Sequence, residues 1–147
     1  MKPRNLLQHA PDAYQHVLAL EQHVRSKLDH RLLHLVKIRA SMLNGCAFCL
    51  DMHTTDAIAA GEDPRRLFAL GAWRESTFFN DAERAALELT DTVTRLDEHG
   101  VPDSVWEPVV AAHGEDGAAE LVVAIATINV WNRLAVANHS HAPALAG

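Results

Sequence analysis

The chain is poor in several residue types, and each scarcity excludes a class of function. Its 147 residues include only four phenylalanines, three tryptophans and one tyrosine, too few for an aromatic platform that stacks single-stranded nucleic acid. Lysine and arginine number 13 against 19 acidic residues, which gives a formal net charge of −6. Because nucleic-acid binding usually depends on a basic surface, we expect no nucleic-acid partner.

Long hydrophobic runs are also missing. The longest, "LVVAIATINVW" near the C-terminus, is interrupted by Thr127 and Asn129 and is shorter than the roughly 20 residues that span a membrane. The N-terminal residues contain no apolar segment of signal-peptide length. We therefore expect no membrane partner and a cytoplasmic protein, in which a CxxC motif is typically catalytic or metal-binding rather than a structural disulfide.

The hydrophobic residues that are present follow helical periodicity almost everywhere. Apolar positions recur near every 3.6 residues, and no segment alternates convincingly with period two. We expect a single all-α domain spanning residues 1–147, a bundle of about seven helices. The predicted helices cover residues 11–26, 29–43, 46–61, 63–76, 80–100, 102–114 and 116–140, with the sixth bent or interrupted by Pro108.

Both cysteines stand in one motif, "NGCAFCLDMH", at the start of the third predicted helix. Asn44 and Gly45 end the preceding helix, so Cys46 falls in a first turn, where free backbone N–H groups and the helix dipole favour a thiolate. Cys49 and His53 are four residues apart, the spacing at which helical side chains meet, so His53 is a candidate general base for Cys49. A peroxide attacked by one thiolate gives a sulfenic acid that the other cysteine resolves to a disulfide. The spacing leaves open which cysteine attacks.

Two other interpretations of the cysteines are open. Free cysteines often pack in protein cores as small hydrophobes, and the two residues between these cysteines are apolar. The stronger alternative is zinc binding by a structural or redox-sensing module. The Cys2His2 ligands would be Cys46, Cys49, His53 and His34. Against zinc, such pairs usually lie in small loop-rich domains, whereas this chain is long enough for a core without metal. A thioredoxin fold is not expected, because no strand precedes the motif.

Three segments resemble the alkyl hydroperoxidase D-like (AhpD-like) proteins of the carboxymuconolactone decarboxylase superfamily, in their single-domain branch. They are "LVKIRASMLNGCAFCLDMHTTDA", "LFALGAWRESTFFNDAERAALELTDTVT" and "INVWNRLAVA". The likeness extends over about residues 32–137. It implies an all-α fold with the CxxC motif at the N-terminus of a central helix, assembly as a homo-oligomer, usually a trimer or hexamer, and thiol-dependent peroxidase activity.

The resemblance also implies a role for each residue of the motif. It makes Cys49 the cysteine that attacks a hydroperoxide, Cys46 the one that resolves it to a disulfide, and His53 the proton relay. The electrons would come from a dithiol reductant, of lipoyl or thioredoxin-like type. No bound cofactor is expected.

This chain departs from the family pattern at one position. Many members have a glutamate twelve residues before the first cysteine, acting with the histidine in the relay, and here that residue is His34. A histidine supplies no fixed negative charge, although near neutral pH it can itself accept or donate a proton. Glu83 is a candidate substitute carboxylate if the fold brings it to His53. The departure leaves open a carboxymuconolactone decarboxylase-type scaffold with weak or no peroxidase activity, although the decarboxylases generally lack paired cysteines.

Overall fold

The computed structural model describes all 147 residues, which form seven α-helices and one short 3-10 helix and no strand, so the predicted all-α class is confirmed. The elements are α1 (Leu6–His9), α2 (Pro11–Lys27), α3 (His30–Asn44), α4 (Ala47–Ala59), α5 (Pro64–Ala69), η1 (Leu70–Ala72), α6 (Asp81–Thr94) and α7 (Asp103–Asn138).

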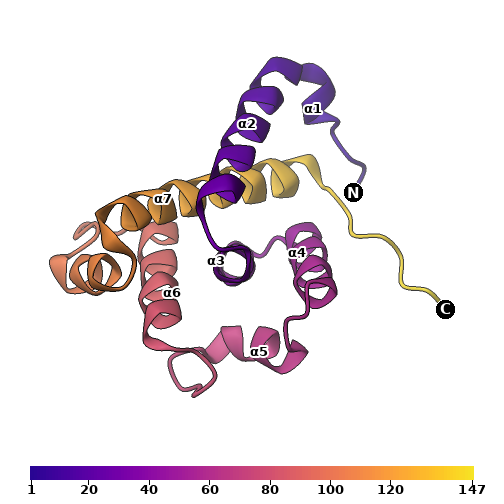
Figure 1. The fold of residues 1–147 in the computed structure, drawn as a ribbon. Coiled ribbons are helices and arrows are strands. Elements are labelled where there is room, and N and C mark those ends of the chain that lie inside the picture. Colours follow the sequence, from indigo (N-terminus) through magenta and orange to yellow (C-terminus); the bar gives the residue numbers. More distant parts are fainter.

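Helix α3 lies at the centre of the molecule, and α4, α5, α6 and α7 surround it when it is viewed end-on (Figure 1). Its sequence suits this place, because apolar residues occur around most of its circumference. Leu32 and Val36 pack in a cluster with residues of α6 and α7, while Leu35 and Ile38 pack in a second cluster with residues of α4 and α5. The side chain of Asp29 caps the helix, accepting the N–H of Leu32 at 3.0 Å.

The predicted break between the last two helices, 102–114 and 116–140, is confirmed within α7, where Gly114 interrupts the helix with φ 73° and ψ 169°. That conformation is available to glycine because it has no Cβ. The bend predicted at Pro108 was wrong, because Pro108 lies inside α7 and keeps helical geometry. The length and hydropathy of α7 would suffice for a membrane span, but its contacts with α2, α3 and α6 make it a core helix.

Two other predicted helices are shorter than expected. Helix α6 ends at Thr94 rather than near residue 100, and beyond its end Asp97 turns the chain by accepting the N–H of His99 at 2.8 Å. The predicted helix 63–76 is divided into α5 and η1, which ends at Ala72.

Helix α1 was not predicted, because four residues carry no readable periodicity. It is held against the end of α7, where Asn138 accepts the N–H of Arg4 at 2.9 Å through its backbone and that of Leu6 at 3.0 Å through its side chain. The N-terminal segment therefore lies beside the C-terminal end of α7, and the last residues of the chain extend away from there past α4 (Figure 1).

Candidate functional site

The CxxC motif begins helix α4, as the sequence predicted. Cys46 is the N-cap residue and forms a disulfide with Cys49, with 5.3 Å between the two Cα atoms. The sulfur of Cys46 also accepts the backbone N–H of Cys49 at 3.3 Å. Both residues are buried. The structure therefore joins the two cysteines of the motif as a disulfide.

The turn that precedes Cys46 is fixed by hydrogen bonds on both sides. Gly45 has φ 64°, the left-handed conformation that ends many helices, and the N–H of Cys46 donates to the carbonyl of Ser41 at 3.0 Å. The side-chain amide of Asn44 donates to the side-chain oxygens of Asn132 and Asn129 on α7, at 2.9 and 3.0 Å. These contacts tie the start of α4 to the core helices α3 and α7.

Cys49 lies at the wall of a pocket of about 320 Å³ between α2, α4 and α7, and Cys46 does not. His53 lines the same pocket, one helical turn after Cys49. Its other walls are mainly apolar and include Leu6, Leu7, Tyr14, Leu18, Phe48, Met52, Trp131 and Leu134. The rings of Tyr14 and Trp131 meet edge to face, with centroids 5.4 Å apart. This volume and lining suit a small organic molecule with an apolar body.

His53 is held neutral by its surroundings. Only 5% of its surface is exposed, and burial, together with the positive charge of Lys37, lowers its pKa from 6.5 to about 4. At neutral pH the imidazole is therefore unprotonated. Cys49 lines the same pocket, one helical turn earlier on α4.

A second pocket, of about 270 Å³, shares His53 with the first pocket and is polar. Its lining includes Arg25, His30, His34, Lys37, His53 and Asp56. The Nδ1 atom of His34 is buried there without a hydrogen-bond partner, and burial, followed by the charge of Lys37, lowers the pKa of His34. Cys49 lines the apolar pocket and His34 lines the polar one. His53 lines both, so it is the residue that the two pockets share.

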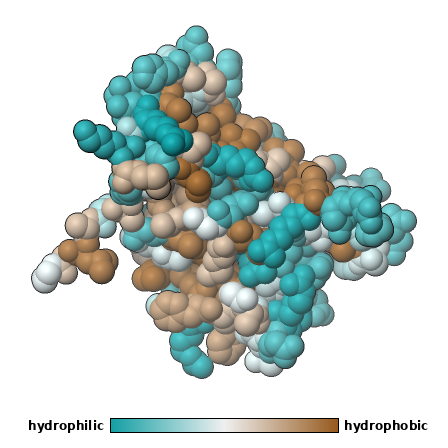
Figure 2. All heavy atoms as spheres, turned by 180° about the vertical axis from the view of Figure 1, so that it is seen from behind, coloured by the Kyte–Doolittle hydropathy of each residue, from teal (hydrophilic) through white to brown (hydrophobic).

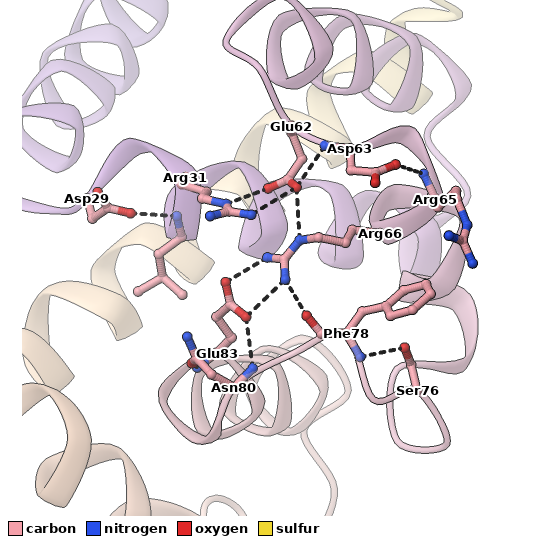
Figure 3. A network of polar contacts seen from close by, with 11 residues as sticks. Asp29, Arg31, Glu62, Asp63, Arg65, Arg66, Ser76, Phe78, Asn80 and Glu83 are labelled. Carbon is pink, nitrogen blue, oxygen red and sulfur yellow. Dashed lines mark hydrogen bonds and ion pairs between the residues drawn. The ribbon is translucent and has the colours of Figure 1, made fainter.

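Glu83, the fifth candidate, lies elsewhere. Its carboxylate accepts Arg66 Nη2 at 2.6 Å and the backbone N–H of Asn80 at 3.0 Å, completing a capping box at the start of α6 (Figure 3). It lines neither of the pockets that contain His53. The suggestion that Glu83 substitutes for the family glutamate therefore finds no support in the fold, because helix capping and Arg66 occupy its oxygens.

The carboxylate that does line the pocket with Cys49 and His53 is Glu21 of α2, which the sequence analysis missed. Glu21 is 5% exposed and forms a buried ion pair with Lys37 of α3. A signal was present, because Tyr14, Leu18 and Glu21 follow helical spacing on one face of α2. A charged residue at a position of the apolar face indicates either a buried ion pair or a site.

The ligand set proposed for zinc is not assembled. The two cysteines are bonded to each other, and no three side chains of His, Cys, Asp or Glu lie together as a group that could hold a metal ion. The zinc alternative therefore has no geometric support.

A comparison with known proteins agrees with this geometry. The model of the carboxymuconolactone decarboxylase family matches residues 10–92, more than half of the chain. The chain belongs to this family. Among its relatives is the uncharacterized protein YdfG of Bacillus subtilis (strain 168), which is 39% identical over 129 residues, 87% of this chain and 88% of YdfG.

Solved structures place the chain more closely within the carboxymuconolactone decarboxylase family. A protein of unknown function from Agrobacterium tumefaciens, provisionally assigned as the antioxidant defence protein AhpD, superposes with a TM-score of 0.94 at 39% identity, over 99% of this chain and 100% of that one. The chain is thus an AhpD-like member. The debrominase Bmp8 shares the fold, with a TM-score of 0.80 at 21% identity over 94% of this chain and 75% of Bmp8.

Proposed function

We propose that the protein is a thiol-dependent peroxidase that reduces organic hydroperoxides through a Cys46–Cys49 dithiol/disulfide cycle, with an antioxidant role. One observation carries the proposal. Cys49, already paired with Cys46, lies in an apolar pocket beside a buried, neutral histidine.

In the reduced protein, the Cys49 thiol gives its proton to His53, and the thiolate attacks the terminal oxygen of the hydroperoxide. The O–O bond breaks, Cys49 becomes a sulfenic acid, and the alkoxide takes the proton from His53 and leaves as an alcohol. Cys46 then attacks the sulfur of Cys49, forming the disulfide and releasing water. A dithiol reductant, of lipoyl or thioredoxin-like type, restores both thiols and is itself oxidised to a disulfide.

The roles assigned to the two cysteines are supported by their surroundings. Cys49 lines the apolar pocket and is one turn from His53, whereas Cys46 lines neither pocket. His34 has an unpartnered nitrogen and lines the polar pocket that His53 also lines, so in this proposal it passes protons between His53 and solvent.

We also propose that the protein works in the cytoplasm as a homo-oligomer, a trimer or hexamer. Hydrophobic residues form a band across the face seen in Figure 2, at the level of α7 in Figure 1, with hydrophilic residues on both sides. The exposed large hydrophobic residues of α2 and α7 are Leu20, Val130 and Val136. A surface of this kind is typical of subunit contacts, and light scattering on the purified protein measures the assembly.

The cysteine roles are tested by substituting each cysteine in turn. Cys49→Ser should abolish consumption of cumene hydroperoxide, because the attacking sulfur is gone. Cys46→Ser should consume one equivalent and stop, since the sulfenic acid has no partner. Intact mass after one equivalent of hydroperoxide distinguishes these results: loss of two hydrogens in the wild type, one added oxygen in Cys46→Ser and no change in Cys49→Ser.

Two outcomes contradict the proposal at different levels. Full turnover by Cys49→Ser together with loss of turnover in Cys46→Ser would exchange the two roles. Unreacted thiols in the reduced wild-type protein would mean that the chain is a scaffold of its family without peroxidase chemistry.

A further inference from the structure

One carboxylate oxygen of Glu21 has hydrogen-bond partners, and the other has none. Its Oε1 atom accepts Arg25 Nε at 3.0 Å and also the ammonium of Lys37. Its Oε2 atom is buried and has no hydrogen-bond partner. Glu21 lines the same apolar pocket as Cys49 and His53, so the free acceptor belongs to a residue of the proposed reaction site.

The charge on Glu21 is maintained by its neighbours. Burial opposes the charged form, but the hydrogen bonds and charges of Lys37 and Arg25 outweigh it and lower the pKa of Glu21. An ionised carboxylate can only accept hydrogen bonds. Because a buried acceptor without a donor is unfavourable, Oε2 is suited to a ligand that brings a donor with it.

We propose that Glu21 Oε2 accepts the hydrogen bond of an O–H group at the end of a neutral, apolar substrate and so holds that end beside Cys49. The inference deepens the proposed function and rests on it in one respect, since it identifies the O–H group as that of a hydroperoxide. Because the walls of the pocket are mainly apolar, the substrate class is neutral organic hydroperoxides with a compact apolar body.

The contact is compatible with every bond change of the reaction. Attack by Cys49 breaks the O–O bond and transfers the terminal oxygen, with its hydrogen, to sulfur. The O–H bond itself stays intact, so the same group can remain hydrogen-bonded to Glu21 as the sulfenic acid. Glu21 thus orients the oxygen that is attacked, while His53 handles the proton of the thiol.

The test uses two unreactive ligands that differ in one donor. Cumyl alcohol keeps the apolar body and the O–H group of cumene hydroperoxide, and cumyl methyl ether lacks the donor. We expect calorimetry on the oxidised wild-type protein to show the alcohol binding about tenfold more tightly than the ether, the size of effect expected for a hydrogen bond to a charged group. Glu21→Gln should reduce this preference to about threefold or less, because the acceptor loses its charge.

Two further variants make the result specific. Glu21→Gln leaves Lys37 buried without its partner, so the double variant Glu21→Gln/Lys37→Met removes both charges and should also lose the preference while remaining folded. Glu62→Gln is the matched control, because Glu62 is an equally buried carboxylate with arginine partners that lines neither pocket around His53. It should keep the tenfold preference.

The inference is overturned if the ether binds the wild type as tightly as the alcohol, if neither binds, or if the Glu21 variants keep the preference. None of these measurements requires oxidation of a cysteine. A wild-type protein that prefers the alcohol through Glu21 but does not react with cumene hydroperoxide would retain the O–H site and refute the peroxidase proposal. Reaction with hydroperoxide without a preference for the alcohol would refute this inference alone.

Discussion

Two groups of buried carboxylates in this protein differ in what their oxygens contact. Around Glu62, one oxygen accepts Arg66 Nε and the N–H of Asp63, at 2.9 and 3.0 Å, and the other accepts Arg31 Nε at 2.9 Å (Figure 3). Arg66 continues the network to Glu83. At Glu21, by contrast, the ion pair with Lys37 uses one oxygen, and the other is buried without a donor in a residue that lines a pocket.

The difference separates a structural role from a functional one. The Glu62 network joins α3, α5 and α6 through contacts that satisfy its charges, and a fully satisfied network holds elements in place. The Glu21 pair joins α2 to α3 but keeps an unsatisfied acceptor next to Cys49 and His53. A buried polar atom without a partner is uncommon in a folded protein and calls for an explanation, such as a catalytic role or an ordered water or ion. At Glu21 the explanation that we propose is the O–H group of a substrate.

The largest effect on stability that tests this comparison is expected from removing one partner of the Glu21–Lys37 ion pair. Lys37→Met leaves Glu21 buried without its main cation, so we expect the free energy of unfolding in urea to fall by about 3–5 kcal/mol. The double variant Glu21→Gln/Lys37→Met should recover most of this loss, because no buried charge remains. If Lys37→Met were as stable as the wild type, water would reach the Glu21–Lys37 ion pair, and burial of the pair would not distinguish it from the Glu62 network.

A somewhat smaller loss of stability is expected when the pH is lowered. The pKa of His53 is lowered from 6.5 in the unfolded chain to about 4 in the fold, so between these pH values the unfolded chain binds the extra proton. Stability therefore rises with pH across this window, and acidification from pH 6.5 to 4 should remove about 3 kcal/mol. Urea unfolding at a series of pH values measures the slope. His53→Gln should flatten it, and an unchanged slope in that variant would assign the effect to other groups such as His34.

Much of this arrangement was predictable, and the exceptions have physical reasons. The place of the CxxC motif at the start of α4 and the position of Cys49 and His53 on the wall of one pocket follow from local spacing, because residues four apart lie on the same face of a helix. Glu21 was not predictable in the same way, because its importance depends on how α2 packs against α3 and α4. Glu83 was misleading because its carboxylate serves its own helix, where it completes a capping box with the asparagine three residues before it.

The smallest effect is expected at Glu83, and it tests whether the satisfied network is only structural. Glu83→Gln keeps an acceptor for the N–H of Asn80 but removes one negative charge from Arg66, which retains Glu62. We expect a loss of about 1 kcal/mol in the free energy of unfolding and an unchanged rate of Cys49 oxidation by cumene hydroperoxide. Stopped-flow tryptophan fluorescence and urea unfolding measure the two quantities on the same sample. A tenfold slower oxidation in a fully folded Glu83→Gln variant would show that this network acts on the cysteines after all, and that saturation of hydrogen bonds does not separate the two groups of carboxylates.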